Sequence, residues 1–282
     1  MAPGGRRLLA RPDNRRRRRQ ASLERFALEV ARRDFEERQG AAPLSPVVAL
    51  VAAYDEEDNI GDVLKAMPER AAGLPVSTLV VVDGGTDRTA EIARDAGVAT
   101  CVLPVNLGHG TALKLGYAIA AERGARYVVT LDADGQNDPA ELESILQPVV
   151  DGEADVVIAS RRLGVDQTTD RVRRAGVKFY AGAINTVTGQ RLTDSSNGYR
   201  AFRVEVLWDI LPRLVQDQYQ TAEVIITAAR RGWRITERPT VWRPRASGTS
   251  KKGGNLFFGL QYGRVIGQTW WRTRRRHSRP AP

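Results

Sequence analysis

Short apolar segments alternate with helical ones along most of this 282-residue chain, and this alternation limits the fold more than any other feature. Apolar runs with the length of buried strands occur at residues 47–53, 78–82, 99–103, 127–131 and 155–160. Helical periodicity fills the intervals at residues 59–72, 89–96, 111–122 and 139–150. Continuous apolar strands separated by helices predict a mostly parallel sheet that helices flank on both faces. We therefore expect an α/β fold.

After residue 160 the alternation is less regular, with helices predicted at 172–187 and 221–231 and a strand at 234–241. In open parallel sheets, ligands bind beyond the carboxyl ends of the strands. The polar residues that directly follow predicted strands are Tyr54, Asp83, Asn106, Asp132 and Arg161. These side chains are expected to meet in one crevice, and the second half of the chain is expected to form its acceptor side.

Asp132 and Asp134 lie two residues apart, where the apolar run 127–131 ends. Burying an ionised carboxylate without a partner is costly, so this pair is expected to face a ligand rather than the core. Carboxylate oxygens suit Mg²⁺ or Mn²⁺, which one or two carboxylates commonly hold together with substrate phosphates. A simpler alternative is that both residues cap a helix that begins near Pro139. The sequence of residues 132–135 alone is compatible with both interpretations.

Basic residues outnumber acidic ones, 43 to 33, and the net charge of +10 arises largely at the two ends of the chain. Arg15 to Arg19 are consecutive, and a second group begins at Arg272. Such arginines attract phosphate charge of any origin, which suits an anionic membrane surface, nucleic acid or a solvated tail. Because no recognition module accompanies the charge, no specific nucleic-acid partner is expected.

Four segments are expected along the chain. Residues 1–20 lack apolar periodicity and are predicted to form a disordered basic tail. Residues 21–46 comprise an amphipathic helix and a linker, and residues 47–252 form a single domain that follows this basic N-terminal extension. Residues 253–282 mix aromatic, aliphatic and basic side chains, a composition typical both of an interfacial helix and of a helix packed on the domain.

The location of the protein is predicted from three further features. No stretch approaches the roughly 18 consecutive apolar residues of a membrane span, and the first residues lack the apolar core of a signal peptide. The single cysteine, Cys101, excludes an intrachain disulfide and fits a reducing compartment. A cytoplasmic protein is expected, with peripheral association at the cytoplasmic face of the membrane as an option because the ends are basic.

Seven segments in a fixed order carry a family resemblance. They read VAAYDEE from residue 51, VVDGGTD from 81, NLGHG from 106, DADGQ from 132, SR from 160, DSSNGYRAF from 194 and RASGTSK from 245. Together they resemble a family 2 glycosyltransferase of the GT-A fold, over roughly residues 47–252. Within that family, the late basic segment and the Gly-aromatic-Arg segment are most similar to the branch of dolichol-phosphate and polyprenyl-phosphate mannosyltransferases.

The resemblance implies a site for a nucleotide sugar. The residues implied to bind it are Ala52, Tyr54, Glu56, Val81, Asp83, Asp132, Ala133, Asp134, Gln136, Arg161, Arg245 and Lys251. Asp132, Asp134 and Gln136 are the implied ligands of Mg²⁺ or Mn²⁺. Cationic groups aimed at a departing diphosphate stabilise the transition state, which is the role implied for Arg161, Arg245 and Lys251. Asp134, Arg245, Lys251 and Glu223 form the implied catalytic set.

The role of Glu223 depends on the acceptor. A hydroxyl acceptor must lose a proton during attack, which requires a base such as Glu223 within hydrogen-bond reach. A lipid phosphate is already ionised near neutral pH, and Glu223 would then orient the acceptor or the neighbouring helix.

The sequence departs from the family pattern around the nucleoside. Ala52 and Asp55 stand where the family pattern has proline and asparagine, and Val82-Asp83-Gly84-Gly85 replaces Asp-Asp-Gly-Ser. The donor is therefore expected to carry either guanosine diphosphate or uridine diphosphate.

Three hypotheses follow. The first is a metal-dependent, inverting glycosyltransferase that moves mannose or glucose from a GDP- or UDP-linked donor to polyprenyl phosphate, with a separate membrane-protein partner as an option. The second keeps this donor but uses a hydroxyl of a soluble glycan, metabolite or protein as the acceptor. The third, from another class, is a non-catalytic module whose arginine-rich ends bind an anionic membrane or nucleic acid.

Overall fold

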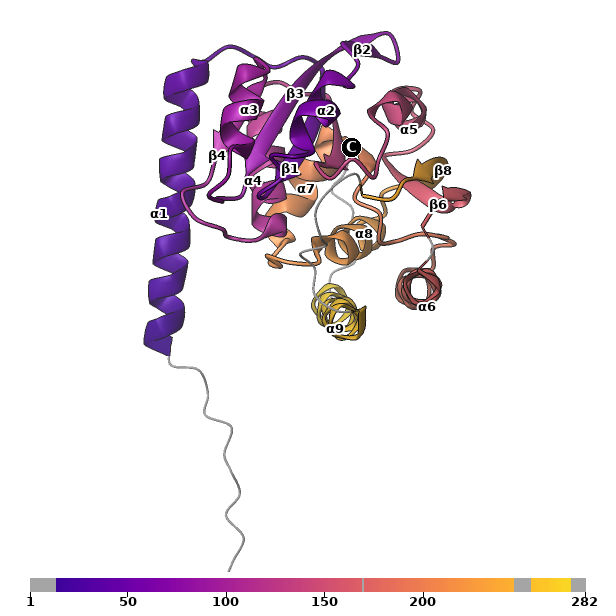
Figure 1. Cartoon of the computed structure of the whole chain (residues 1–282). Helices are drawn as coiled ribbons and strands as arrows, with labels where there is room; N and C mark the ends of the chain where they lie inside the picture. The colour runs from indigo at the N-terminus through magenta and orange to yellow at the C-terminus, as the bar shows by residue number, and fades with distance from the viewer. Residues whose placement is uncertain (1–13, 169, 246–254, 275–282) are drawn as a thin grey trace, which may run out of the picture.

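The computed structural model describes residues 14–168, 170–245 and 255–274, and its centre is one eight-stranded sheet (Figure 1). The strands pair in the order β2-β3-β1-β5-β7-β6-β8, and β4 also pairs with β3. Their bounds are β1 (Val47–Ala53), β2 (Arg70–Ala71), β3 (Leu74–Val82), β4 (Ala99–Val102), β5 (Tyr127–Asp132), β6 (Val156–Asp166), β7 (Arg200–Arg203) and β8 (Ile235–Trp242).

The first half of the sheet is parallel, as the apolar runs predict. Strand β1 pairs in parallel with both β3 and β5, and β3 pairs in parallel with β4. All seven residues of β1 are buried, because Val48 and Leu50 face one core cluster while Ala49 and Val51 face another. Burial on both faces explains why this strand is a continuous apolar run rather than an alternating one.

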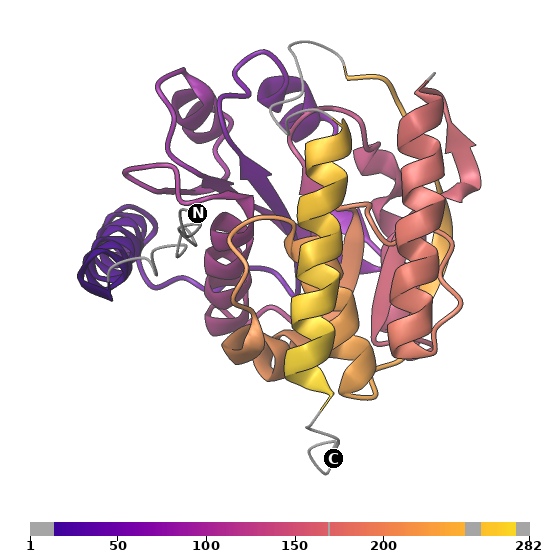
Figure 2. The ribbon, with the colours of Figure 1, turned by 90° about the horizontal axis from the view of Figure 1, so that it is seen from below.

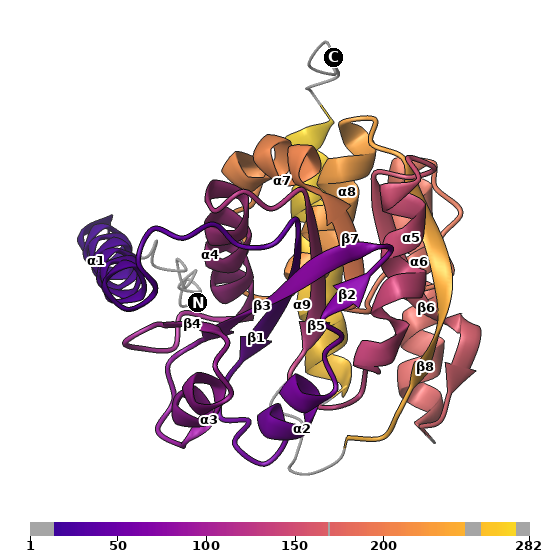
Figure 3. The same ribbon diagram turned by 90° about the horizontal axis from the view of Figure 1, so that it is seen from above.

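Helices cover both faces of the sheet (Figure 3). The core on one face is closed by α2 (Ile60–Lys65), α3 (Thr89–Asp95) and α5 (Leu142–Val150). The other core is closed by α4 (His109–Glu122), α6 (Arg171–Thr188), α7 (Val204–Ile210), α8 (Gln220–Arg230) and α9 (Asn255–Thr273). Two 3₁₀ turns, η1 (Pro139–Glu141) and η2 (Leu211–Arg213), precede α5 and follow α7.

Two sequence expectations about the elements are wrong. The helix expected at 59–72 ends at Lys65, because Pro68 disfavours helical backbone just before it, and β2 follows instead. Strand β7 was not expected at all, yet it pairs antiparallel with both β5 and β6. It is only four residues long and begins and ends with arginine, so it carries no apolar run that would indicate a strand.

The N-terminal helix α1 (Asn14–Gln39) stands at the edge of the sheet beside β4 (Figure 1). Ala27, Ala31 and Phe35 are buried there, while Leu23 and Phe26 on the outer side are exposed. The helix begins at Asn14, so the disordered tail expected over residues 1–20 is wrong for its last part, where arginines favour helix. The first thirteen residues lie outside the described part of the chain.

Helices α6 and α9 lie side by side on the lower face of the molecule (Figure 2). Tyr180 of α6 packs edge-on against Tyr262 of α9, and a Cβ at Gly259 would lie 2.7 Å from the Tyr180 hydroxyl oxygen. Glycine at 259 thus permits the close approach of the two helices. Among the described helices, none combines the length and the apolar character that crossing a bilayer requires.

Candidate active site

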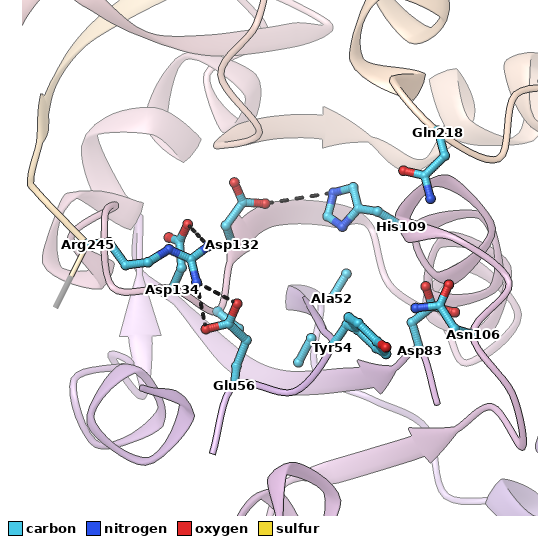
Figure 4. A pocket seen from close by; sticks show the side chains of 12 residues that line it. Ala52, Tyr54, Glu56, Asp83, Asn106, His109, Asp132, Asp134, Gln218 and Arg245 are labelled. Carbon is cyan, nitrogen blue, oxygen red and sulfur yellow. Dashed lines mark hydrogen bonds and ion pairs between the residues drawn. The ribbon is translucent and has the colours of Figure 1, made fainter. Parts of the chain in front are cut away.

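A pocket opens at the carboxyl ends of β1, β3 and β5 (Figure 4). Parallel strands bring residues that follow different strands to the same edge of the sheet, which is where ligands bind in such folds. The pocket is lined by Ala52, Ala53, Tyr54, Glu56, Asp83, Asn106, His109, Asp132, Ala133, Asp134, Gln218 and Arg245. The crevice expected from the sequence therefore exists, and four of its lining residues are acidic.

Strand β5 delivers two carboxylates to the pocket. Asp134 is 6% exposed, and its Oδ1 accepts a hydrogen bond of 3.1 Å from the backbone N–H of Gln136 across the turn at Gly135. Asp132 Oδ1 lies 3.8 Å from Nε2 of His109. A Cβ at Gly198 would lie 3.0 Å from Asp132 Oδ1, so only glycine leaves this carboxylate its present position.

Arg245 joins two sides of the pocket (Figure 4). Its Nη1 lies 2.9 Å from Oε1 of Glu56, which follows β1, and its Nη2 lies 3.0 Å from Oδ2 of Asp134, which follows β5. Both carboxylates are largely buried, so the guanidinium compensates two charges in a region with little water. Arg245 follows β8 and is the last described residue before the gap at 246–254.

Asp83 closes the pocket beyond β3. The side chain is 3% exposed, and its Oδ1 accepts a 2.8 Å hydrogen bond from the backbone N–H of Leu107. Desolvation by burial raises the pKa of Asp83 to about 6, against the lowering effect of the backbone N–H groups of Leu107 and Gly108. A carboxyl with this pKa in the lining of a pocket is a candidate for ligand contact.

Most of the residues implied to bind the nucleotide sugar meet in this pocket, namely Ala52, Tyr54, Glu56, Asp83, Asp132, Ala133, Asp134 and Arg245. Val81 is buried in β3, where it pairs with Ala52 and Cys101, and does not line the pocket. Gln136 turns its Nε2 toward the backbone oxygen of Arg243, 3.0 Å away. Lys251 lies outside the described residues.

Arg161 and Glu223 also lie away from the pocket lining. Arg161 is 5% exposed and forms a bidentate ion pair with fully buried Asp194, with Nε 2.7 Å from Oδ2 and Nη2 3.0 Å from Oδ1. Glu223 is fully buried at the start of α8, where backbone N–H groups and Arg272 bind its carboxylate. These contacts favour the interpretation in which Glu223 orients its surroundings.

Three lining residues are not among those expected in the crevice or implied to bind the nucleotide sugar. They are Ala53, His109 and Gln218. Gln218 comes from the loop before α8. In the sequence it lies more than a hundred residues after the lining residues between Ala52 and His109. No sequence signal marks it, because the topology alone brings that loop to the pocket.

The family model described as Glycosyl transferase family 2 matches residues 48–211, more than half of the chain. The chain is a family 2 glycosyltransferase. It has the GT-A fold, and the resemblance seen in the sequence is confirmed.

Relatives extend this similarity beyond the family model. The chain is 34% identical to a dolichyl-phosphate hexose transferase of Haloferax volcanii, over 72% of this chain and 85% of the relative. It is 30% identical to an undecaprenyl-phosphate mannosyltransferase of Micrococcus luteus, over 74% and 88% of the two chains. Among solved structures, glucosyl-3-phosphoglycerate synthase of Mycobacterium tuberculosis, in complex with Mn²⁺, UDP and glucosyl-3-phosphoglycerate, matches with a TM-score of 0.63. That match covers 86% of this chain and 83% of the other at 19% identity, so it supports the fold alone.

The pocket of this glycosyltransferase fits a divalent ion that protein and substrate share. Asp132 and Asp134 present carboxylate oxygens, whereas the Gln136 amide is directed elsewhere. In the described ranges, no three His, Cys, Asp or Glu side chains are grouped to hold a metal. Mg²⁺ and Mn²⁺ accept one or two carboxylates when substrate phosphates complete the shell. The residues therefore suit an ion that binds with a nucleoside diphosphate rather than alone.

The raised pKa of Asp83 predicts a pH-dependent stability of this glycosyltransferase. Between its ordinary pKa of 3.8 and about 6, the folded state binds more protons at Asp83 than the unfolded chain does. Ionisation of Asp83 therefore lowers stability as the pH rises through this window. Asp83→Asn should gain stability relative to the wild type between about pH 4 and 7, by at most about 3 kcal/mol. Urea unfolding of both proteins at about pH 4 and about pH 7 tests this prediction. A stability difference between Asp83→Asn and the wild type that is the same at both pH values would contradict it.

Proposed function

We propose that this enzyme transfers a hexose, mannose or glucose, with inversion from a nucleoside diphosphate sugar to the phosphate of a polyprenyl lipid. The printed names of its relatives support this acceptor, since they are transferases of dolichyl phosphate and undecaprenyl phosphate. The pocket supports the donor, since its two β5 carboxylates and Arg245 lie where ligands of such sheets bind.

The assignment of a phosphate acceptor rests on one observation, a cationic side chain near the pocket. Arg173, near the start of α6, lies 5.5 Å from the ring centre of Trp242, and the Arg161 guanidinium lies 4.6 Å from the same ring. In the described part of the chain, Arg173 forms no ion pair within 4.0 Å. Burial lowers the pKa of Arg173 and the charge of Arg161 lowers it further, while Asp134 opposes both. A phosphate monoanion or dianion would compensate this charge within reach of the donor pocket.

Trp242 supports the same position. It is 3% exposed, and among the described residues its Nε1 has no hydrogen-bond partner. A buried indole N–H normally finds an acceptor, so a ligand oxygen is a suitable partner here. Arg161 is already bound to Asp194 and to the Ser196 hydroxyl at 2.6 Å, which makes it a support for Trp242 rather than a contact of the leaving group.

The proposed reaction needs no protein base. An oxygen of the acceptor phosphate forms a bond to the anomeric carbon as the bond from that carbon to the donor diphosphate breaks, and the nucleoside diphosphate leaves with the electron pair. A phosphate monoester is ionised near neutral pH, so no proton has to be removed. The engagement of Glu223 in structural contacts is compatible with this chemistry, whereas a hydroxyl acceptor would require another base.

The leaving group and the nucleoside have separate binding groups in this proposal. Asp132 and Asp134 would hold Mg²⁺ or Mn²⁺, which neutralises charge on the departing diphosphate. Arg245 would move from Asp134 to the diphosphate oxygens, and Lys251 would assist it. Tyr54 and Asp83 would contact the nucleoside at the far side of the pocket, and both GDP- and UDP-linked sugars are donors to test.

The lower face of the molecule supports peripheral contact with a membrane. Exposed apolar side chains on α6 and α9 include Val172, Phe179, Leu260 and Trp271, on two helices that lie side by side (Figure 2). Basic side chains accompany them, since Lys178 is exposed and Arg274 stacks on Trp271. Apolar and basic groups together suit an anionic lipid surface, from which an acceptor phosphate could reach Arg173.

The proposal is tested by label transfer. The purified protein is incubated with Mn²⁺ or Mg²⁺, radiolabelled GDP-mannose, GDP-glucose or UDP-glucose, and polyprenyl phosphate in anionic vesicles. Label that enters the organic phase only when acceptor is present supports the proposal. Label that stays in the aqueous phase on a glycan or metabolite hydroxyl would contradict the lipid acceptor.

Arg173→Ala is expected to raise the KM for a short-chain polyprenyl phosphate about tenfold or more, because a charge-assisted hydrogen bond is lost. The dissociation constant of the nucleoside diphosphate should stay unchanged. Arg174→Ala serves as the matched control, since Arg174 is the exposed neighbour on the same helix. Equal effects of the two substitutions, or a loss of nucleotide affinity in Arg173→Ala, would contradict the assignment of the acceptor phosphate to Arg173.

A further inference from the structure

The segment of residues 215–218, just before α8, forms one wall of the donor pocket. Gln218 lines the pocket directly, on the same side as His109 and Asn106 and away from Arg245 (Figure 4). The segment packs on the loop of residues 106–110, where the Gly110 N–H donates to the Asp217 backbone oxygen at 2.8 Å. A Cβ at Gly108 would lie 2.6 Å from that oxygen, so the two loops touch backbone to backbone.

Side chains reinforce this contact between the loops. Asp217 Oδ1 accepts from the Thr111 hydroxyl and from Lys114 Nζ, each at 3.2 Å. The loop of residues 106–110 also contributes Asn106 and His109 to the pocket lining. A displacement of segment 215–218 would therefore change the pocket wall at two places, at Gln218 and through the loop beneath it.

Glu223 holds this segment from behind. Its carboxylate is fully buried and accepts from the backbone N–H of Val215, with distances of 3.0 and 3.1 Å, and from that of Gln216 at 2.9 Å. Tyr219 has a positive φ of 57°, which turns the chain sharply between the segment and α8. This turn directs Glu223, in the first turn of α8, back onto the N–H groups of the segment.

Helix α9 completes the arrangement. Nη2 of Arg272 lies 2.5 Å from Oε1 of Glu223, and Nε2 of Gln216 lies 3.1 Å from Oε1 of Gln268. A buried carboxylate is costly without its charge partner, so Arg272 stabilises the position of Glu223 and with it the segment. The same helix carries the exposed side chains of Leu260 and Trp271.

We propose that Glu223 is a positioning residue that fixes segment 215–218 as a wall of the nucleotide site, and that Arg272 couples this wall to helix α9. The inference rests on the nucleotide site of the proposed function and not on its lipid acceptor. Glu223 acts through backbone N–H groups, so its loss should alter donor binding rather than the chemical step.

The test measures binding of UDP and GDP with Mn²⁺ by calorimetry in the full-length protein. Arg272→Gln is expected to weaken the tighter of the two nucleotides about fivefold to tenfold, and Arg272→Lys should restore most of the affinity. Arg264→Gln is the matched control, an exposed arginine of the same helix, and should leave affinity unchanged. In turnover with the sugar donor, the donor KM should rise in Arg272→Gln while kcat changes less than twofold.

Gln268→Ala removes the second contact between α9 and segment 215–218, the hydrogen bond from Gln216 to Gln268. It is expected to weaken nucleotide binding about twofold. Because this substitution is mild, it keeps the test decisive if Arg272→Gln fails to fold. Wild-type affinity in both Arg272→Gln and Gln268→Ala would overturn the inference. A wild-type protein that binds neither nucleotide would overturn the proposed function together with it, so the two failures are distinguishable.

Discussion

Replacing Asp134 with asparagine is expected to lower kcat/KM about a thousandfold while leaving the fold intact. The amide keeps the shape of the side chain and can still accept from the Gln136 N–H at its Oδ1 position. It loses the charge that would hold a divalent ion against the donor diphosphate, an electrostatic contribution typically worth two to three orders of magnitude, ~10²–10³. Initial rates with the nucleotide sugar at saturating acceptor measure the effect.

Metal dependence and a matched control sharpen this prediction. EDTA should abolish turnover of the wild type, and added Mn²⁺ should restore it but leave Asp134→Asn inactive. Asp138→Asn is the control, because Asp138 lies four residues further along, caps η1 and pairs with Arg243 outside the pocket lining. Near-normal turnover of Asp134→Asn in the presence of EDTA would contradict the assignment of the metal to this carboxylate.

The substitution Asp134→Asn has two effects. It removes the carboxylate that would hold the metal, and it removes one of the two carboxylates that pair with Arg245. Glu56→Gln separates the two effects, since it loosens Arg245 without touching the β5 carboxylates. If the loss in Asp134→Asn arose only from a misplaced Arg245, Glu56→Gln should show a loss of similar size. We expect a loss of about tenfold for Glu56→Gln, well below that of Asp134→Asn.

One physical reason made the parallel part of the fold, and the pocket residues at its strand ends, accessible to sequence reasoning. A strand buried on both faces must be a continuous apolar run, and its carboxyl end is the place where polar residues first appear. Asp83 and Asp132 are identified by this break in composition alone. The family resemblance then assigned a ligand to these strand ends, which hydrophobic periodicity does not do.

The partners of the charged residues were not accessible in this way. With 43 basic and 33 acidic residues in the chain, spacing does not indicate which carboxylate meets which arginine. Arg161 was assigned to the diphosphate, yet Asp194, 33 residues further on, binds it in the interior. Glu223 was considered as a base, yet Arg272 from the C-terminal helix binds it. Both pairs depend on how β7 and α9 pack, and neither packing has a signature in the sequence.

Removing the Asp194 carboxylate is expected to destabilise the protein by about 3–5 kcal/mol, since breaking a buried ion pair leaves an uncompensated charge. Asp194 is fully buried, and besides Arg161 it accepts from the Ser196 N–H at 3.0 Å. Asp194→Ala would leave the Arg161 guanidinium 5% exposed and without its charge partner beside Trp242. Urea unfolding measures the loss, and the midpoint temperature should fall by roughly 10 °C.

A surface pair provides the matched control. Arg88 and Glu91 lie 2.9 Å apart with more than half of each side chain exposed, so Glu91→Ala should cost only a small fraction of the stability lost in Asp194→Ala. A loss in Asp194→Ala no larger than that in Glu91→Ala would show that the buried pair contributes nothing beyond a surface contact. That result would also weaken the role of Arg161 in supporting Trp242.

The double variant Arg161→Met with Asp194→Leu separates two quantities. One is the destabilisation caused by an unpaired buried charge, and the other is the net contribution of the ion pair to the free energy of unfolding. Replacing a buried ion pair by apolar groups of similar size is often neutral or stabilising, so the double variant should be more stable than Asp194→Ala. It should nevertheless transfer sugar poorly, because Trp242 loses the guanidinium that stacks on it and Arg173 loses its support. Recovered stability with a raised acceptor KM would mean that the pair is retained for the geometry of the acceptor site. Recovered stability together with a wild-type acceptor KM would mean that Trp242 keeps its position without Arg161.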